Sequence, residues 1–284
     1  MSTDYRAYVR EEPERLELRV DGSTVARFAA AVGDEHPDHA ATAGATAPPT
    51  FAFVLAMTNG AFAFPTDGLI HAEQSFTFER PVRVDERLVI ARALTRARRR
   101  GEGEGAMWLL TWEATAADTH GTTVFRAVSR LVARPAGERP SDDEAGAGQR
   151  AAPGTPPAEP DLKGPAIVLG RERIAAYADV SGDHNPIHLS DDVARAYGLE
   201  GVIAHGMLSL ALVATVAEDW ARAAGGDLAA LSGRFVAPVP AGERVRALGR
   251  SEADDTASLG LWAEDGGERV RATARRTRPG GPRP

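Results

Sequence analysis

Asp183 and His188 are the two residues whose types and spacing point most directly to acid–base chemistry in this sequence. Asn185-Pro186 stands between them, and proline stops a helix because it lacks a backbone N–H and restricts the preceding residue. Gly182 ahead of them is typical of a helix end, since glycine adopts the left-handed C-cap conformation easily. We therefore expect the carboxylate and the imidazole at two ends of a short rigid loop, where they can act as a general acid and base.

The sequence around this pair resembles the (R)-specific enoyl-CoA hydratase pattern of the MaoC-like dehydratases. The matching positions are Tyr177, Gly182, Asp183, Asn185, Pro186, His188 and Ala194. A second block, Gly201-Val-Ile-Ala-His205-Gly206-Met207, resembles the signature that opens the central helix of the family's hot-dog fold. The two blocks occur in the family's order and spacing, so the resemblance is more specific than an isolated Asp–His pair.

The resemblance implies a hydro-lyase that hydrates trans-2-enoyl thioesters or dehydrates (R)-3-hydroxyacyl thioesters in fatty-acid, polyketide or related acyl metabolism. It assigns catalysis to Asp183 and His188, without deciding which is the acid and which the base in each direction. The reaction requires no metal and no other cofactor. The structural alternative is that Asp183 caps a turn and that His188 is a buried histidine with its hydrogen bonds satisfied.

A second part of the site should be the start of the helix that follows the second block. Free N–H groups and the positive end of the helix dipole converge there, and they would stabilise the enolate-like oxyanion of a thioester. Gly206 is the expected backbone donor, because a residue without Cβ lets the substrate approach closely. Supporting roles in the loop and at the helix start fall to four neighbours, namely Ser181, Gly182, Asn185 and His205.

A segment rich in proline, glycine, alanine and charge divides the sequence nearly in half. We expect residues 135–165 to form a mobile linker, because such a composition buries too little apolar surface to offset the entropy of ordering. The prediction is therefore an N-terminal domain over residues 1–134 and a C-terminal domain over residues 166–284, which carries the Asp183 and His188 motif.

The two halves resemble each other, which indicates a duplication. Val32–His39 aligns with Ser181–His188, and Phe76–Val82 aligns with Gly233–Val239. Alternation of apolar and polar residues predicts antiparallel strands near 88–92, 107–112, 122–128, 244–248, 258–262 and 269–274. With the resemblance, this predicts an α+β double hot-dog, in which two curved antiparallel sheets each wrap around a central helix.

Each half should contain one long helix between its motif and its strands. Residues 206–224 are apolar on nearly every side, which predicts a buried helix. In the first half the helix should begin near Pro48-Pro49, since proline is tolerated in the first helical turn. Four phenylalanines follow, and they are candidates either for the wall of an acyl tunnel, as in related two-domain enzymes, or for core packing: Phe51, Phe53, Phe62 and Phe64.

The first half repeats the Asp–His spacing at Asp34 and His39, which raises the question of a second site. His36 replaces the asparagine of the motif there. Pro48 and Pro49 stand where the second half has its helix-opening glycine, and neither can donate a backbone hydrogen bond. We therefore expect a vestigial site, in a half that shapes the acyl tunnel instead.

The composition is that of an acidic protein without cysteine. The 284 residues carry a formal net charge of −7 and no Cys, which excludes disulfides, thiolate metal sites and a cysteine nucleophile. The net charge gives no indication of nucleic-acid binding. The first residues lack the apolar core of a signal peptide, and no stretch is apolar enough to cross a bilayer. We expect a cytoplasmic enzyme that binds neither nucleic acid nor membrane.

Two other classes of function remain open at this point. A hot-dog thioesterase would cleave the same thioesters by directing water to C1, and it would release a free thiol. A non-catalytic acyl-thioester binding protein would bind them without turnover. In every case the expected partner is an acyl group on CoA or on acyl-carrier protein. The two halves should pair as an intrachain pseudo-dimer, with further homodimerisation left open.

Overall fold

The computed structural model describes residues 3–60, 62–66, 69–101, 106–133, 154–253 and 255–278. The elements of the N-terminal half are η1 (Tyr5–Tyr8), β1 (Glu14–Arg19), α1 (Gly22–Val32), α2 (Phe51–Met57), β2 (Leu69–Phe78), β3 (Arg87–Arg100), β4 (Met107–Asp118) and β5 (Thr123–Ala133). Those of the C-terminal half are β6 (Leu162–Val168), α3 (Arg171–Ser181), η3 (Pro186–His188), α4 (Asp191–Ala196), α5 (Gly206–Ala223), β7 (Leu228–Phe235), β8 (Arg244–Ser251), β9 (Thr256–Ala263) and β10 (Glu268–Arg276). The strands predicted by alternation all appear, as parts of β3, β4, β5, β8, β9 and β10.

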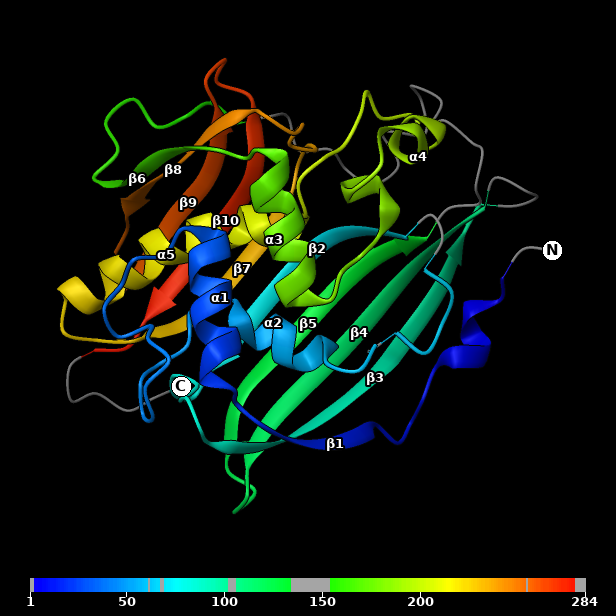
Figure 1. The fold of residues 1–284 in the computed structure, drawn as a ribbon, viewed down its shortest axis with the longest axis horizontal. Coiled ribbons are helices and arrows are strands. Elements are labelled where there is room, and N and C mark those ends of the chain that lie inside the picture. Colours follow the sequence, from blue (N-terminus) through cyan, green and yellow to red (C-terminus); the bar gives the residue numbers. More distant parts are fainter. Residues whose placement is uncertain are drawn as a thin grey trace.

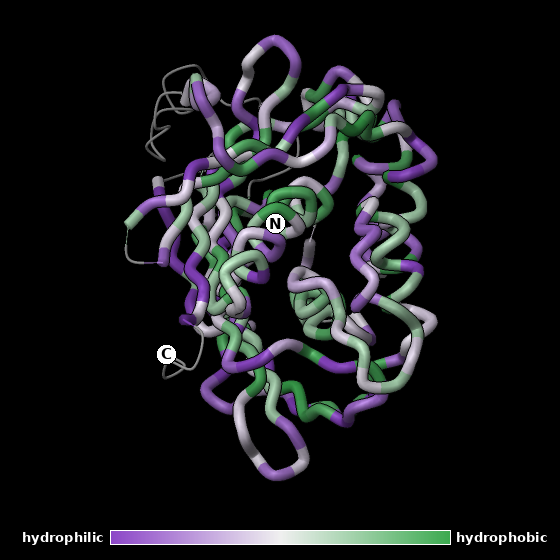
Figure 2. Tube along the Cα trace, turned by 90° about the vertical axis from the view of Figure 1, so that its left-hand side faces the viewer, coloured by the Kyte–Doolittle hydropathy of each residue, from purple (hydrophilic) through white to green (hydrophobic). Residues whose placement is uncertain are grey.

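All ten strands form one antiparallel sheet in the order β1-β3-β4-β5-β2-β7-β10-β9-β8-β6 (Figure 1). The order of the first five strands repeats in reverse in the last five, so the halves are related as the two subunits of a dimer would be. Viewed from the side, the helices lie on one face of this sheet (Figure 2). The prediction of two repeats, each a curved antiparallel sheet with a helix against it, is confirmed.

The two predicted sheets are continuous with each other, because β2 and β7 join them. These strands pair antiparallel from Glu73 with Arg234 to Thr77 with Ala230. Each would otherwise be an edge strand with a row of unpaired backbone groups, and pairing the two edges removes both. The halves therefore share a central seam, and any cavity on the helical side of that seam can draw residues from both.

Helix α5 is the central helix of the C-terminal half, and it matches the predicted range. It packs against all five strands of its own half. Most of its residues are buried, as expected for a helix that is apolar nearly all round. Glu218, near its C-terminal end, is a buried carboxylate that the apolar pattern did not predict.

Helix α2, its counterpart, begins where predicted but ends after only seven residues. Asn59 and Gly60 have φ angles of 60° and 71°, and this left-handed backbone ends the helix. Arg92 on β3 then binds the freed carbonyls, because its guanidinium donates to Ala56 O at 2.8 Å and to Thr58 O at 2.6 Å. The expectation of a long helix in each half is therefore wrong for the first half.

The predicted linker also differs from the structure in its second part. Residues 134–153 lie outside the described residues, but residues 154–165 lie on the sheet. Gly154 N donates to Glu268 at 2.7 Å, and Asp161 accepts from Ser251 N at 3.0 Å. Strand β6 then begins at Leu162 and pairs with β8. Hydrogen bonds from backbone and carboxylate groups hold residues 154–165 in place. The low apolar content of this segment does not reveal these bonds.

Within the described residues, none of the helices combines the length and the apolar character needed to traverse a bilayer.

Candidate active site

The loop that carries Asp183 has the predicted construction. Helix α3 ends at Ser181, and Gly182 is its C-cap with a φ of 74°. The Asp183 side chain accepts a hydrogen bond from Asn185 N at 3.2 Å, and the Asn185 side chain accepts one from Ile187 N at 3.3 Å. Pro186 opens the one-turn helix η3, which ends at His188. Asn185 thus fixes the turn between the two reactive side chains.

His188 is buried and oriented by a backbone carbonyl. Its Nδ1 donates to Ile203 O at 2.9 Å, so Nε2 is left as the basic nitrogen of a neutral ring. Burial lowers the pKa of His188, against the opposing effect of the Asp183 carboxylate. The imidazole is therefore neutral near pH 7 and can accept a proton at Nε2.

One carboxylate oxygen of Asp183 and one ring nitrogen each of His188 and His205 lie within 4.8 Å of one another. No direct hydrogen bond joins the Asp183 and His188 side chains in the part of the chain that the structure describes. Two groups at this separation can both hydrogen-bond to a single oxygen atom between them, since each such bond spans about 2.8 Å. The spacing suits a water molecule or a substrate hydroxyl.

His205 connects the loop to the start of α5. Its Nε2 donates to the backbone oxygen of Asp183 at 2.9 Å, and its ring lies 3.8 Å, centroid to centroid, from that of His188. Burial, the neighbouring His188 and other local groups bring its pKa to about 4, so it is neutral. His205 therefore holds the Asp183 loop against the helix start, which agrees with the supporting role expected of it.

Gly206 is the first residue of α5, and no side chain caps the N–H groups of this first turn. A Cβ placed on Gly206 would lie 3.1 Å from carbons of the Phe235 ring, which is a tight contact. The glycine is thus required by the packing of Phe235 as well as by access to the backbone. The N-terminus of α5 lies next to the Asp183–His205 hydrogen bond, where free N–H groups can receive an oxyanion.

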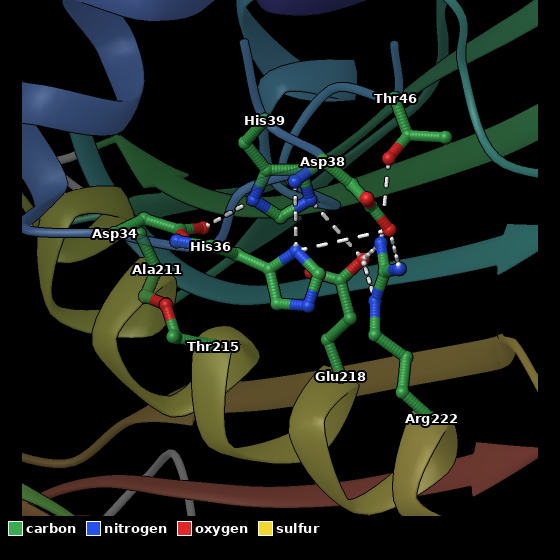
Figure 3. A network of polar contacts seen from close by, with 9 residues as sticks. All are labelled: Asp34, His36, Asp38, His39, Thr46, Ala211, Thr215, Glu218 and Arg222. Carbon is green, nitrogen blue, oxygen red and sulfur yellow. Dashed lines mark hydrogen bonds and ion pairs between the residues drawn. The ribbon is translucent and has the colours of Figure 1, made fainter.

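The Asp34 and His39 pair has a different geometry, although its sequence spacing is the same. His39 Nδ1 donates directly to Asp34 at 2.8 Å, and Nε2 faces Glu218 of α5 at 3.3 Å (Figure 3). Arg222 also bonds Glu218, at 2.8 Å, and Asp38 at 2.6 Å. Burial by itself lowers the pKa of His39, but the bonds to Asp34 and Glu218 raise it to about 9.

The start of α2 has two prolines where the start of α5 has His205 and Gly206, and so it offers fewer backbone donors. Pro48 and Pro49 have no N–H, and the N–H groups of Phe51, Ala52 and Phe53 already have acceptors. Phe51 N donates to Pro48 O at 2.9 Å, Ala52 N to Pro49 O at 3.3 Å, and Phe53 N to Thr50 O at 3.0 Å. A small surface pocket beside the two prolines is lined in part by Glu218 and Arg222. The first half therefore lacks the donor arrangement found at Gly206.

The four candidate wall residues divide into two groups. Phe51 packs on Phe28 in the core, and Phe53 faces His71 of β2 with 5.6 Å between ring centroids. Phe62 and Phe64 belong to an aromatic cluster farther along the first half, with Trp112 and Tyr5. Of the four, only Phe53 has a ring contact with His71, a histidine whose pKa the Asp183 carboxylate affects.

The sequence analysis missed His71 and included Tyr177 only as a matching position of the motif. The Tyr177 hydroxyl and His71 Nε2 are buried without a hydrogen-bond partner, and the Asp183 carboxylate affects the pKa of both. A signal for His71 was present, because the alignment of the halves sets this polar residue opposite the buried Leu228.

Two groups of side chains among the described residues are close enough to hold a metal ion. Asp34, His39 and Glu218 form one group, but both ring nitrogens of His39 face carboxylates and Arg222 adds a positive charge. Asp183, His188 and His205 form the other. Each histidine there keeps one nitrogen without a protein partner. The acid–base chemistry implied by the sequence requires no metal, and its absence stays a prediction.

The sequence matches two family models, one in each half. Residues 9–127 match the FAS1-like dehydratase domain region, and residues 151–273 match the MaoC like domain. A 3-hydroxyacyl-thioester dehydratase X of Mycobacterium tuberculosis is 31% identical over 206 residues, which cover 69% of this chain and 66% of that protein. The match thus spans about two thirds of this relative's length.

Solved structures share the fold over nearly the whole chain. A MaoC-like dehydratase from Phytophthora capsici has a TM-score of 0.74 at 16% identity, covering 97% of this chain and 99% of the other. A Mycobacterium tuberculosis protein described as having a double hotdog fold has a TM-score of 0.63 at 13% identity, with coverages of 94% and 97%. These likenesses confirm the predicted fold.

Proposed function

Because the chain belongs to the MaoC-like dehydratases, with a FAS1-like dehydratase region ahead of its MaoC-like domain, we propose that it is a hydro-lyase acting on acyl thioesters. The reaction is the reversible hydration of a trans-2-enoyl thioester, which is the reverse of the dehydration of an (R)-3-hydroxyacyl thioester. The observation that carries the proposal is the meeting of the Asp183 carboxylate, the basic Nε2 of His188 and the start of α5 in one place.

In the hydration direction, Asp183 and His188 hold a water molecule between them. One of the pair takes a proton from the water as its oxygen bonds to C3, and a proton is delivered to C2. The reverse sequence removes the C2 proton and protonates the departing C3 hydroxyl. The neutral His188 suits the proton-accepting role, and positioned proton transfer contributes typically about 10²- to 10⁴-fold in rate.

The backbone N–H of Gly206 stabilises the negative charge that develops on the thioester oxygen. Changing Gly206 to alanine should lower kcat by roughly 10²-fold, because the new Cβ meets Phe235 and displaces the donor or the ring; loss of one oxyanion donor costs about 10²- to 10³-fold. The measurement is steady-state hydration of crotonyl-CoA by the variant. Gly170→Ala serves as the control, since a Cβ there meets open space. An unchanged kcat in Gly206→Ala would remove the oxyanion role from this residue.

The Asp34 and His39 pair is vestigial in this proposal. Its two side chains bond each other, Glu218 engages the remaining ring nitrogen, and the prolines before α2 offer no donor. Both ring nitrogens of His39 already have carboxylate partners, so neither can take a proton from a substrate. We therefore assign one active site to each chain, in the C-terminal half, and give the N-terminal half a role in enclosing the acyl group.

The test of the proposed function is the enoyl absorbance of crotonyl-CoA, followed together with free thiol. Loss of the enoyl signal without thiol release supports the hydro-lyase. Release of thiol would identify a thioesterase instead. Substrate binding without either change, on longer acyl chains as well, would identify a binding protein. The same assay with crotonyl groups on acyl-carrier protein decides between the two carriers.

The oligomeric state belongs to the same proposal. The β2–β7 seam pairs the halves within one chain, as the two subunits of a single hot-dog dimer would pair. A single chain therefore contains every part of the site described above, and the proposed activity requires no second chain.

A further inference from the structure

Buried polar atoms without partners gather around Asp183. Five such side-chain atoms occur in the described residues, and three of them belong to Tyr177, His205 and His71. The Tyr177 and His205 rings lie 4.9 Å apart, centroid to centroid, and His205 Nε2 donates to the Asp183 backbone oxygen at 2.9 Å. The Asp183 carboxylate also acts on the pKa of the His71 imidazole. Leaving a buried polar atom unpaired costs about 1–3 kcal/mol. The polar groups of a bound ligand can supply the missing hydrogen bonds.

Tyr177 and His205 belong to the C-terminal half, but His71 comes from β2 across the seam. Part of the His71 residue is accessible, whereas its Nε2 has no solvent contact. Its ring lies 5.0 Å from that of Phe235, centroid to centroid, and 5.6 Å from that of Phe53. Phe235 is also the residue that covers Gly206. His71 is thus linked through one ring to the start of α5.

An irregularity in β2 brings His71 to this position. The pairing with β5 shifts between His71 and Glu73, so that Ala72 is an extra residue. Gln74, Phe76 and Phe78 form the buried face of the strand. In a regular strand the side chain of Ala72 would lie on this buried face. Because Ala72 is the extra residue, the side chain of His71 lies on the buried face instead. Bulges that redirect a side chain are common beside active sites.

His71 is uncharged at the working pH of an enzyme. Burial brings the pKa of its imidazole to about 4, although the Asp183 carboxylate and Gln74 oppose this effect. A neutral imidazole carries one N–H and one lone pair. In the tautomer with the hydrogen on Nε2, that nitrogen can donate a hydrogen bond without placing a fixed positive charge beside Asp183. Such a group can bind a neutral carbonyl oxygen and stabilise it further as negative charge develops.

We propose that His71 Nε2 is a second hydrogen-bond donor to the thioester oxygen, alongside the N–H of Gly206. The C3 oxygen already has partners in Asp183 and His188, whereas Gly206 supplies only one donor to the thioester. His71 and Gly206 both lie against the Phe235 ring. The N-terminal half thereby contributes a polar substrate contact, in addition to enclosing the acyl chain. This inference rests on the proposed function for its catalytic effect, but the contact itself predicts binding.

The test replaces His71 with phenylalanine, which keeps a ring between Phe53 and Phe235 and removes both nitrogens. We expect kcat for crotonyl-CoA hydration to fall by about 10²-fold, since an oxyanion donor acts mostly in the transition state. The affinity for butyryl-CoA, a saturated thioester that cannot react, should fall by a smaller factor, about 3- to 10-fold, the cost of a neutral hydrogen bond of roughly 0.5–1.5 kcal/mol. The melting temperature should be unchanged or slightly higher.

Trp108→Phe is the matched control, because it also removes a buried unpartnered N–H, in a cluster with Tyr5 and away from Asp183. It should leave kcat and butyryl-CoA affinity unchanged. Wild-type kcat and affinity in His71→Phe would overturn the inference. If the wild type proves not to be a hydro-lyase, two measurements still test whether His71 binds the thioester. They are the butyryl-CoA titration and the shift of the His71 Nε2 resonance in ¹⁵N-histidine spectra on adding butyryl-CoA. If the His71 Nε2 resonance does not shift on adding butyryl-CoA, the proposed contact is refuted.

Discussion

Asp183→Asn and His188→Ala should each lower turnover of crotonyl-CoA by about 10²- to 10⁴-fold, the usual contribution of a positioned acid or base. The asparagine keeps the size of Asp183 and its acceptor for Asn185 N, but it can neither take nor give the proton. The Ile203 carbonyl accepts the hydrogen on His188 Nδ1, which leaves Nε2 as the basic nitrogen, and the alanine removes it. Enoyl absorbance measures the loss in both variants.

Asp192→Asn is the control for the first of these changes, because Asp192 is a nearby carboxylate whose side chain is 96% exposed. It should have wild-type turnover. These variants also distinguish an enzyme from a binding protein. A binding protein would retain butyryl-CoA affinity in every variant and would show no turnover in any protein, the wild type included. If either Asp183→Asn or His188→Ala kept near-wild-type turnover, the acid–base assignment would be wrong.

His39→Gln should have the opposite profile, with turnover within a few-fold of wild type and a large loss of stability. The pKa of His39 is about 9 in the folded protein, against an ordinary value of 6.5. The folded state therefore binds this proton more tightly than the unfolded chain. The resulting stabilisation, on the order of 3 kcal/mol, is complete below pH 6.5 and disappears as the pH rises through 9.

Urea unfolding of the wild type and His39→Gln at pH 6 and pH 9 measures this contribution. The difference in unfolding free energy between the two proteins should be large at pH 6 and should shrink toward pH 9. His71 and His205, whose pKa values are near 4, destabilise both proteins alike below pH 6.5 and cancel in the comparison. A turnover loss as large as that of His188→Ala would show that the first half is catalytic.

The sequence predicted the Asp183 loop well because its signals are local. Gly182 ends one helix, Pro186 prevents its continuation, and Asn185 caps the turn, so no distant residue is needed to form it. The start of α5 was predictable for the same reason, from an apolar run that follows Gly206. Both features depend on backbone preferences that act within a few residues.

The parts that could not be predicted depend on contacts between the halves. Glu218 contacts His39, which lies 179 residues earlier in the sequence. A single glutamate in an otherwise apolar helix gives no indication of that partner. His71 reaches the site through a bulge, which pattern alone does not reveal, and through pairing of β2 with β7. The early end of α2 depends on Arg92 of β3, which binds carbonyls that a longer helix would have used itself.

The unequal lengths of α5 and α2 have a consequence for how such a protein can evolve. In a dimer of identical subunits every substitution occurs twice, so shortening the central helix would remove it from both sites at once. Fusing two copies into one chain lifts that restriction. One copy can then lose turns of its central helix while the other copy keeps them. The seven-residue α2 and the eighteen-residue α5 are a pair of unequal central helices that two identical subunits could not have, and under the proposed function this inequality allows the halves to take different roles.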